Sequence, residues 1–250
     1  MYLKRKADAY LNAWKSDPNR SPLIIKGPRQ VGKTETIDYF AAHNYRSVVE
    51  INFVEEPKYR AITADGYGAD TIVRNISLID PAKKFIPGDT LIFFDEIQAH
   101  PDIVTALKFF KIDGKYDVIC SGSMLGISYK QIESNSVGYK TDYEMRSLDF
   151  EEFLWARGYD EAVIESMFTH LCDATPFSEV EMNVFSTAFM DYCVLGGMPA
   201  VVASHIRTGT FEGTLQLQRQ LILDYQEDIR KYAQGLDQAR ILNVFNHIPV

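Results

Sequence analysis

The stretch Pro22-Leu23-Ile24-Ile25-Lys26-Gly27-Pro28-Arg29-Gln30-Val31-Gly32-Lys33-Thr34 decides the fold of this 250-residue chain. It begins as a short apolar run typical of a buried strand, and a helical pattern starts at Lys33. Residues 27–34 match the pattern GxxxxGK[ST], whose glycines let successive backbone N–H groups turn toward a phosphate. The helix that follows adds the positive end of its dipole to the same place. We call residues 27–34 the phosphate loop.

Each residue of the phosphate loop has an expected role in binding a nucleotide. The residues expected to surround the phosphates with their backbone are Gly27, Pro28, Arg29, Gln30, Val31 and Gly32. We expect Lys33 to reach the β- and γ-phosphates and the Thr34 hydroxyl to bind Mg²⁺. ATP and Mg²⁺ are therefore the predicted cofactors. The alternative is a glycine-rich turn that carries a surface lysine.

A pair of acidic residues follows a second apolar run, about sixty positions after Lys33. The run 91–94 predicts a buried strand, which we expect to lie beside the first strand. Asp95 is then placed to bind Mg²⁺, usually through water, and Glu96 to orient and deprotonate an attacking water. A catalytic base for water favours an ATPase over a nucleotide kinase. The alternative is a pair that caps the next helix.

Two serines follow the apolar run Tyr116–Cys120. In ATPases with this architecture, a polar side chain at the tip of the strand between the two motifs senses the γ-phosphate. Ser121 and Ser123 are the candidates for this sensor, with Ser123 slightly favoured. A serine after a strand is also a common way to start a turn, so both interpretations stay open.

The spacing of apolar residues predicts the fold class. Helical spacing over residues 2–15 comes before the first strand, and further strands are predicted at Ser47–Phe53, Thr90–Phe94 and Tyr116–Cys120. Buried strands that alternate with helices are typical of a parallel sheet covered on both faces. Residues 1–150 are therefore predicted to be an α/β three-layer sandwich of the P-loop NTPase type.

Helical spacing replaces the strands after about Phe150. It is found over residues 150–170, 181–195 and 211–233. The sequence predicts a mainly helical segment over 151–250, which could include a winged helix. The charge changes at the same place, since residues 1–150 hold 20 basic and 20 acidic side chains whereas 151–250 hold 6 and 14.

The net charge of −8 argues against a protein that coats nucleic acid or sits on anionic lipid. Direct nucleic-acid binding by these residues is therefore not expected. Residues 182–204 are apolar enough to suggest a membrane span, but Asp191, Gly196-Gly197 and Pro199 argue against one. The three cysteines lack the spacing of a disulfide framework or a zinc cluster, which favours a reducing, cytoplasmic location.

Seven motifs occur in an order that resembles a known family. They are GPRQVGKT, the NF of EINF (Asn52-Phe53), FFDEIQ, CSGSMLG, SLDFEEFL (Ser147–Leu154), VLGGMPAVV (Val194–Val202) and DYQEDIRKY (Asp224–Tyr232). Together they resemble the prokaryotic AAA-type ATPases with a DUF4143 region, which are related to the archaeal ATPase and STAND groups. The resemblance implies a P-loop ATPase core of residues 1–150, followed by a DUF4143-like helical segment of residues 151–250.

The sequence departs from the family pattern at two places, and the first of them affects the assignment of an arginine. Many relatives have Gly-Arg or Gly-Lys before a PLSFEEFL segment, whereas this chain has Gly138-Tyr139-Lys140 and then Ser147–Phe150. The sensor or finger arginine is therefore not assigned, and the candidates are Arg146, Arg29 and Arg74. Arg5, on the predicted first helix, could contact the adenine or belong to a solvated helix face.

The apolar face at Ile241, Leu242, Val244, Phe245, Ile248 and Val250 continues to the last residue. We therefore expect the chain to be a fragment that lacks a C-terminal domain. The leading hypothesis is an ATPase that uses slow ATP hydrolysis to switch its conformation and act on a protein partner. Formation of an oligomer is compatible with this hypothesis. The alternatives are a nucleotide-gated switch with negligible turnover, and the ATPase part of a DNA-processing protein.

Overall fold

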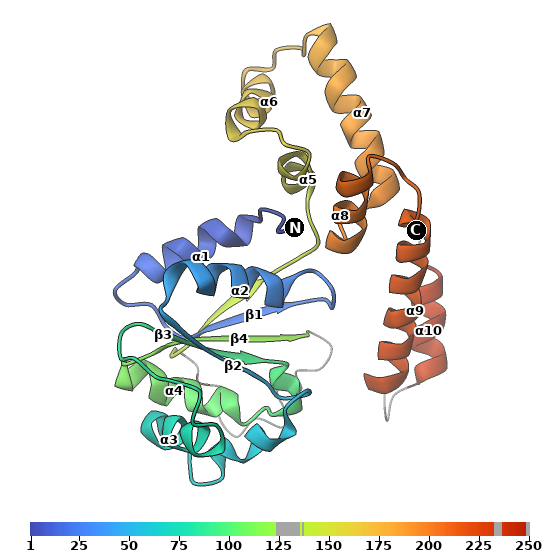
Figure 1. Cartoon of the computed structure of the whole chain (residues 1–250). Helices are drawn as coiled ribbons and strands as arrows, with labels where there is room; N and C mark the ends of the chain where they lie inside the picture. The colour runs from blue at the N-terminus through green and yellow to red at the C-terminus, as the bar shows by residue number, and fades with distance from the viewer. Residues whose placement is uncertain (124–135, 137, 233–236, 249–250) are drawn as a thin grey trace. The chain divides into compact units, whose positions relative to one another are not determined.

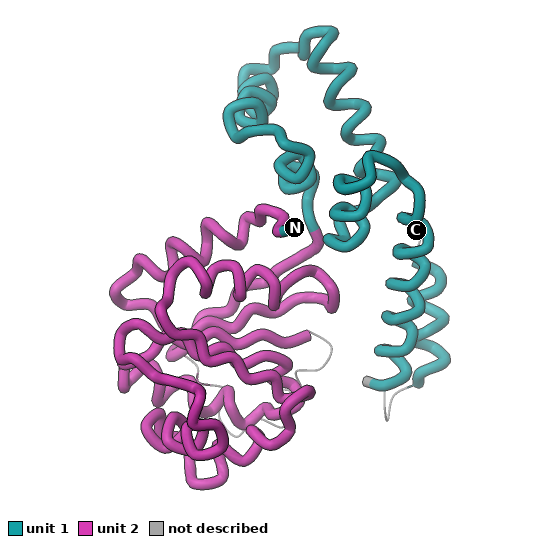
Figure 2. The backbone as a smooth tube through the Cα atoms, viewed as in Figure 1, with its two compact units in different colours: residues 1, 148–250 teal, residues 2–147 magenta. Residues whose placement is uncertain are grey.

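The computed structural model describes residues 1–123, 136, 138–232 and 237–248 of the chain. These residues form two compact units, one of residues 2–147 and one of residues 148–250 together with Met1. Figure 2 shows the first unit in magenta and the second in teal. We call them the sheet unit and the helical unit. Their division lies near the boundary at 150 that the sequence suggests, while the assignment of two domains stays a prediction.

Five parallel strands form the centre of the sheet unit, in the order β2-β3-β4-β1-β5. The strands are β1 (Leu23–Gly27), β2 (Ser47–Asn52), β3 (Thr90–Asp95), β4 (Asp117–Ser123) and β5 (Thr141–Glu144). The helices are α1 (Lys6–Ser16), α2 (Lys33–Asn44), α3 (Ala69–Ile79) and α4 (Ile103–Asp113), with the 3₁₀ helices η1 (Pro57–Thr63) and η2 (Ile97–Ala99). In Figure 1, α1 and α2 cover one face of the sheet and α3 and α4 the other. The predicted α/β class with a parallel sheet is confirmed.

The alternation of side chains along each strand builds a core on both faces of the sheet. The core on the side of α3 and α4 includes Ile24, Ile92, Phe94 and Val118 from the strands, with Ile72, Ile76, Leu107 and Phe110 from the helices. Every residue of β3 is buried, which explains its continuous apolar run. On the other face Trp14 of α1 meets Phe40 of α2 edge to face, with ring centroids 6.3 Å apart.

Three details of the sheet differ from the sequence-based prediction. β3 does not lie beside β1, because β4 pairs with both of them. β4 continues to Ser123, so Ser121 and Ser123 belong to the strand and not to a turn after it. β5 was not predicted, because the edge strand Thr141–Glu144 has one partner strand, is mostly exposed and shows no apolar pattern.

The register brings the predicted site residues to one edge of the sheet. Gly27 at the end of β1 is paired with Ser123 at the end of β4. Asn52 at the end of β2 is paired with Asp95 at the end of β3. Since all these strands are parallel, the phosphate loop, the acidic pair and both serines gather at the carboxyl ends, where α/β sheets commonly hold ligands.

The described part of the helical unit consists of helices. They are α5 (Phe150–Ala156), α6 (Glu161–Asp173), α7 (Glu179–Leu195), α8 (Pro199–Thr208), α9 (Thr214–Tyr232) and α10 (Gln238–Asn246). The predicted helix over 150–170 is broken at Gly158, whose φ of +91° favours glycine. Asp149, Asp160 and Ser178 accept N–H hydrogen bonds as N-caps of α5, α6 and α7. No strand occurs in the described residues of this unit, so the wing of a winged helix is not among them.

Two glycines lie against the backbone on either side of the connection between the units. In the sheet unit, Met145 donates its N–H to the Lys26 carbonyl at 2.7 Å, and a Cβ on Gly27 would lie 2.1 Å from the Met145 carbonyl oxygen. In the helical unit, Leu148 donates its N–H to the Gly197 carbonyl at 2.7 Å, and a Cβ on Gly197 would lie 2.0 Å from the Leu148 carbonyl oxygen. Neither position has room for a side chain.

The residues that the structure describes include no helix of the length and apolarity needed to cross a membrane. The apolar stretch 182–204 is instead divided between α7 and α8, with Gly196 at the end of α7 and Pro199 at the start of α8.

Candidate functional site

The phosphate loop connects β1 to α2 through two residues with left-handed backbone. Gln30 has φ +63° and Gly32 has φ +90° and ψ +22°. Gly32 is the N-cap of α2, and its carbonyl accepts the first helical hydrogen bond from the Thr36 N–H at 3.0 Å. Gly32 therefore needs the conformational freedom of glycine, and α2 starts at Lys33, where the sequence predicts it.

Gly27 is required for a different reason, which is space. The carbonyl of Met145 passes so close that any Cβ at position 27 would overlap with it. The first glycine of the motif thus fits the chain that follows β5, a neighbour that the motif itself does not reveal.

We expect the substitution Gly27→Ala to lower the free energy of unfolding by at least about 2 kcal/mol, the cost typical of overpacking a tight core. Urea unfolding monitored by circular dichroism measures the change. Gly68→Ala is the matched control, because a Cβ there would meet only Thr71 Oγ1 at an ordinary 3.5 Å. A Gly27→Ala variant as stable as the Gly68→Ala variant would contradict the steric argument.

Lys33 lies against its own loop and is 9% exposed. Its Nζ donates to the carbonyls of Gly27 at 3.1 Å and Pro28 at 2.7 Å. Burial lowers the pKa of Lys33, and the nearby carboxylates of Glu96 and Asp95 oppose this effect. The ammonium group is therefore only partly compensated, a state that an anionic ligand would relieve.

Asp95 is the centre of the hydrogen bonds at this edge of the sheet and is 4% exposed. Its Oδ2 accepts from Thr34 Oγ1 at 3.1 Å and from Asn52 Nδ2 at 3.5 Å. Its Oδ1 accepts from the Ser121 hydroxyl and, at 2.9 Å, from the Glu96 N–H. The structure thus brings together the predicted residues Thr34, Asp95 and Ser121, which come from three different parts of the sequence.

Glu96 follows Asp95 in a left-handed conformation, with φ +55° and ψ +44°. This uncommon backbone for a non-glycine residue turns the chain sharply out of β3 and into η2. The Gln98 side-chain amide donates to Glu96 Oε2. Glu96 is therefore held by a neighbour two residues along the chain, and the residue is partly exposed.

The two serines of β4 differ in their surroundings. Ser121 is completely buried and donates to Asp95, so it serves the acidic centre directly. Ser123 is 3% exposed, and its Oγ has no hydrogen-bond partner among the described residues. Buried hydroxyls are nearly always hydrogen-bonded, so among the described residues Ser123 differs from Ser121 in having a hydroxyl without a partner.

Comparison with known families identifies the group to which the chain belongs. The family model described as AAA domain matches residues 19–154, which is more than half of the chain and includes the whole sheet. The chain belongs to the AAA domain family. The helical part of this AAA protein matches a different model, the domain of unknown function DUF8612, over residues 186–250. The DUF4143 resemblance of that part therefore stays a prediction.

Two solved structures that this AAA domain chain matches share little sequence with it. C. elegans PCH-2 is 11% identical with a TM-score of 0.39, over 70% of this chain and 48% of that one. AMPPCP-bound DnaA from Aquifex aeolicus is 13% identical with a TM-score of 0.45, over 92% of this chain and 69% of that one. The chain thus spans about half the length of the PCH-2 chain. A search of curated proteins gave no match.

The arginine candidates lie in different surroundings of the AAA domain. Arg74 and Arg146 are mostly exposed, at 63% and 78% of their side chains, and pair with Asp65 and Glu144. Arg29 lies inside the phosphate loop. For Arg5 the interpretation as part of a solvated helix face is wrong, because the residue is buried, while its contact with adenine stays a prediction. Arg5 precedes α1 as the N-cap residue and is 5% exposed.

Sequence reasoning also missed two polar residues beside the acidic pair of the AAA domain. Asn52 binds Asp95, and its own Oδ1 accepts the N–H groups of Val54 at 2.9 Å and Glu55 at 3.1 Å. Gln98 holds Glu96. Both lie within the motifs EINF and FFDEIQ, and the position of Asn52 at the end of a predicted strand was the available signal.

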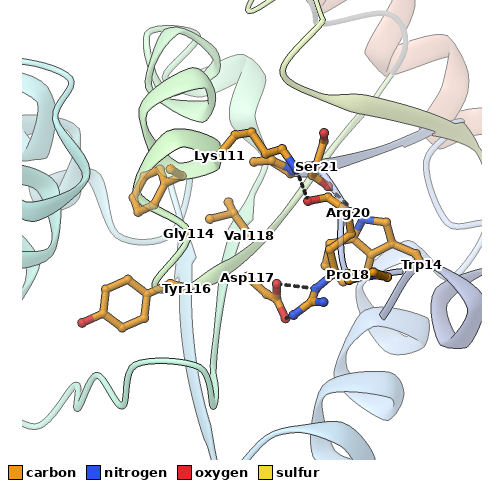
Figure 3. Close-up of a pocket in the computed structure, with 11 residues that line it drawn as sticks. Trp14, Pro18, Arg20, Ser21, Lys111, Gly114, Tyr116, Asp117 and Val118 are labelled. Atoms are coloured by element: carbon orange, nitrogen blue, oxygen red, sulfur yellow. Dashed lines mark hydrogen bonds and ion pairs between the residues drawn. The ribbon is translucent and has the colours of Figure 1, made fainter. Parts of the chain in front are cut away.

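A pocket of about 160 Å³ lies at the opposite edge of the same AAA domain, between the amino ends of β1 and β4 (Figure 3). Asp117 lines this pocket and accepts hydrogen bonds from Nε and Nη2 of Arg20 at 2.6 Å and 3.0 Å. Asp117 also accepts Tyr45 Oη at 2.8 Å and Lys15 Nζ at 3.1 Å. These groups satisfy one another, so the pocket is a structural ion cluster away from the phosphate loop.

Asp117 gives the fold an acid-sensitive element. Burial opposes its ionisation, but hydrogen bonds from Arg20, Tyr45 and Lys15 outweigh burial and lower its pKa below the ordinary value. Its stabilising effect is complete above the unfolded pKa of about 3.9 and disappears as the pH falls through the lower folded value.

We expect Asp117→Asn to cost about 2–3 kcal/mol of unfolding free energy at pH 7, because it weakens several charge-assisted hydrogen bonds. The difference from the native protein should start to shrink below about pH 4, where Asp117 of the unfolded chain takes up a proton, and should disappear below the lower folded pKa. Urea unfolding at both pH values measures this effect. Asp70→Asn, at an ion pair whose aspartate side chain is 77% exposed, is the control with little effect at either pH. A constant difference across the pH range would contradict the assignment.

Proposed function

We propose that this AAA domain protein binds ATP with Mg²⁺ at the phosphate loop and hydrolyses it slowly. The observation that carries the proposal is the 3.1 Å hydrogen bond between Thr34 Oγ1 and Asp95 Oδ2. Thr34 is the last residue of the phosphate loop and Asp95 is the first residue of the acidic pair, 61 positions later. A hydroxyl after the loop lysine, beside an acid at the end of a neighbouring strand, is the arrangement that P-loop NTPases use for MgATP.

The donor atoms at the site fit Mg²⁺ and a nucleotide. Thr34 and Asp95 offer oxygen ligands, and Mg²⁺ prefers oxygen and keeps several of its waters. We propose that these two residues would hold the ion, Asp95 through water. Bound Mg²⁺ supplies charge neutralisation between the phosphates. The buried ammonium of Lys33 and the left-handed loop at Gly32 suit a phosphate chain.

The side chains around this edge have distinct proposed roles. Lys33 exchanges the carbonyls of Gly27 and Pro28 for the β- and γ-phosphates. Glu96 accepts a proton from the attacking water and keeps its orientation through the Gln98 amide. Ser123, whose hydroxyl has no partner among the residues that the structure describes, senses the γ-phosphate, and Ser121 fixes Asp95 instead of acting as the sensor.

Slow turnover is proposed because two of the three candidates for a finger arginine are held in ion pairs on the surface. Arg74 and Arg146 form exposed ion pairs. An arginine supplied by a second copy or by a protein partner would accelerate hydrolysis by stabilising the transition-state charge. In this proposal the protein is a cytoplasmic switch, and ATP and ADP states differ in how it acts on that partner.

The test is titration calorimetry of the full chain with a non-hydrolysable ATP analogue, with and without Mg²⁺, alongside a phosphate-release assay. We expect saturable binding that Mg²⁺ strengthens, and slow phosphate release. Binding without any release would favour the nucleotide-gated switch. Absence of binding at millimolar analogue would reject the function.

A further inference from the structure

Arg5 connects the chain before α1 to the phosphate loop. Its Nη1 donates to the Val31 carbonyl at 2.7 Å, inside the loop, across 26 positions of sequence. Its Nη2 donates to the Arg146 carbonyl at 2.6 Å, across 141 positions. The side chain is 5% exposed. A guanidinium this deeply buried is costly unless its N–H groups are paired, so these two carbonyls help to fix its place in the fold.

The contact with Val31 determines how the loop presents its next N–H group. The described chain contains no cis peptide, so the Val31 C=O and the Gly32 N–H point in opposite directions in one rigid plane. Arg5 holds the carbonyl side of this plane. The Gly32 N–H therefore points away from Arg5, on the side opposite to the guanidinium. The Gly32 carbonyl is held separately by the Thr36 N–H.

The contact with Arg146 ties the same guanidinium to the chain that follows β5. The preceding residue Met145 is itself bonded to Lys26, the last residue but one of β1. The loop is thus held at its start by Met145 and near its end by Arg5. A lysine at position 5 has a single nitrogen and lacks the planar fork that reaches two carbonyls in fixed directions.

Arg5 is in turn held by its own segment. Its backbone N–H donates to Asp8 Oδ2 at 2.8 Å, and Asp8 also accepts the Tyr2 hydroxyl. The Tyr2 ring stacks on Tyr39 of α2, with centroids 3.9 Å apart and an angle of 6° between the rings. The segment before α1 is therefore fixed to the helix that the phosphate loop starts.

We propose that Arg5 is a positioning residue for the phosphate loop, which sets the Val31–Gly32 peptide for phosphate binding without touching the nucleotide. This inference rests on the proposed function for its nucleotide readout. The part of the inference that concerns structure, namely that Arg5 fixes the Val31–Gly32 peptide, does not depend on that function and is tested separately.

The experiment compares the native full-length chain with Arg5→Gln, Arg5→Lys and the control Arg20→Gln. Arg20 is also partly buried and forms a bidentate pair, but at the opposite edge of the sheet. The first readout is hydrogen exchange at the amides of Val31, Gly32 and Lys33 in nucleotide-free protein. The second is the Kd for Mg-ADP by calorimetry, measured well below the melting temperature of each variant.

We expect faster exchange at these three amides in Arg5→Gln and a Kd raised at least about tenfold, which corresponds to about 1.4 kcal/mol. Arg5→Lys should give an intermediate Kd. Arg20→Gln should lower the melting temperature while Kd stays within about twofold, a change under 0.5 kcal/mol. This contrast separates positioning from general destabilisation.

Loop exchange unchanged in Arg5→Gln would overturn the proposal whether or not the protein binds nucleotide. A Kd within about twofold of the native value, when the native chain binds Mg-ADP, would overturn it as well. If the native chain does not bind at all, the proposed function fails, and faster loop exchange confined to the Arg5 variants would still support the positioning of the loop peptide.

Discussion

We expect the Lys33→Ala variant to lose nucleotide binding, with Kd for the ATP analogue raised at least about 100-fold. Hydrogen bonds from a charged group contribute about 1.5–3 kcal/mol each, and two to the phosphates together reach this size. The ammonium group is buried and only partly compensated by Glu96 and Asp95, so removing it costs the free protein little. Calorimetry measures the affinity, and thermal unfolding checks that the variant stays folded.

Lys26→Ala is the matched control for this experiment. Lys26 lies on β1 just before the loop, and its Nζ pairs with Asp142 at 2.8 Å on the neighbouring strand. Its loss should leave the affinity for the ATP analogue within about twofold, because it makes no proposed contact with phosphate. Undiminished binding by Lys33→Ala would show that the nucleotide does not bind at the phosphate loop.

The second large effect is expected from Glu96→Gln, which should lower the rate of phosphate release at least about 100-fold, the usual contribution of a general base. ATP-analogue affinity should change by less than about twofold, since glutamine has the same size and the loop is untouched. The phosphate-release assay at saturating ATP measures the rate. The variant should also accumulate bound ATP.

A surface glutamate provides the control for Glu96. Glu144 is the last residue of β5, with a side chain 47% exposed in an ion pair with Arg146. Glu144→Gln removes one negative charge from the same unit and should leave the hydrolysis rate unchanged. An equal loss of rate in both variants, or none in Glu96→Gln, would show that Glu96 is not the base.

The strands could be predicted where burial on both faces of the sheet requires a continuous run of apolar residues. The run Leu91–Phe94 is apolar because β3 is covered on both faces, and the turn after β1 is recognisable because Gly32 needs a left-handed backbone. The strand order was not accessible from such local patterns. It depends on which buried strand pairs with which, and β4 came between β1 and β3.

The edge strand and Arg5 were missed for related physical reasons. Thr141–Glu144 is held by backbone hydrogen bonds to β1, which any residue can make, so its exposed side chains carry no apolar signal. In the sequence Arg5 stands between Lys4 and Lys6 and is typical of an exposed charge. In the structure it is buried, and its guanidinium donates to carbonyls that lie far away in the sequence. Long-range backbone contacts leave little trace in the residue pattern.

Around the acidic pair, more could be predicted about which residues lie close together than about the hydrogen bonds that hold them. Thr34 and Asp95 meet as the two motifs suggest, whereas the hydrogen bond from Ser121 to Asp95 was not predicted, and the roles of all three toward nucleotide stay predictions. The support from Asn52 and Gln98 depends on the sharp turns after β2 and β3, which residue types alone do not define.

The overlap between Gly27 and Met145 bears on how the loop motif should be read in other chains. Gly27 is constrained by a neighbouring backbone, whereas Lys33 has no comparable steric reason to be lysine. In a descendant that had lost its nucleotide, drift would be expected to erase the lysine first and to spare the glycine. A preserved first glycine would then record shared ancestry of the sheet and not surviving chemistry.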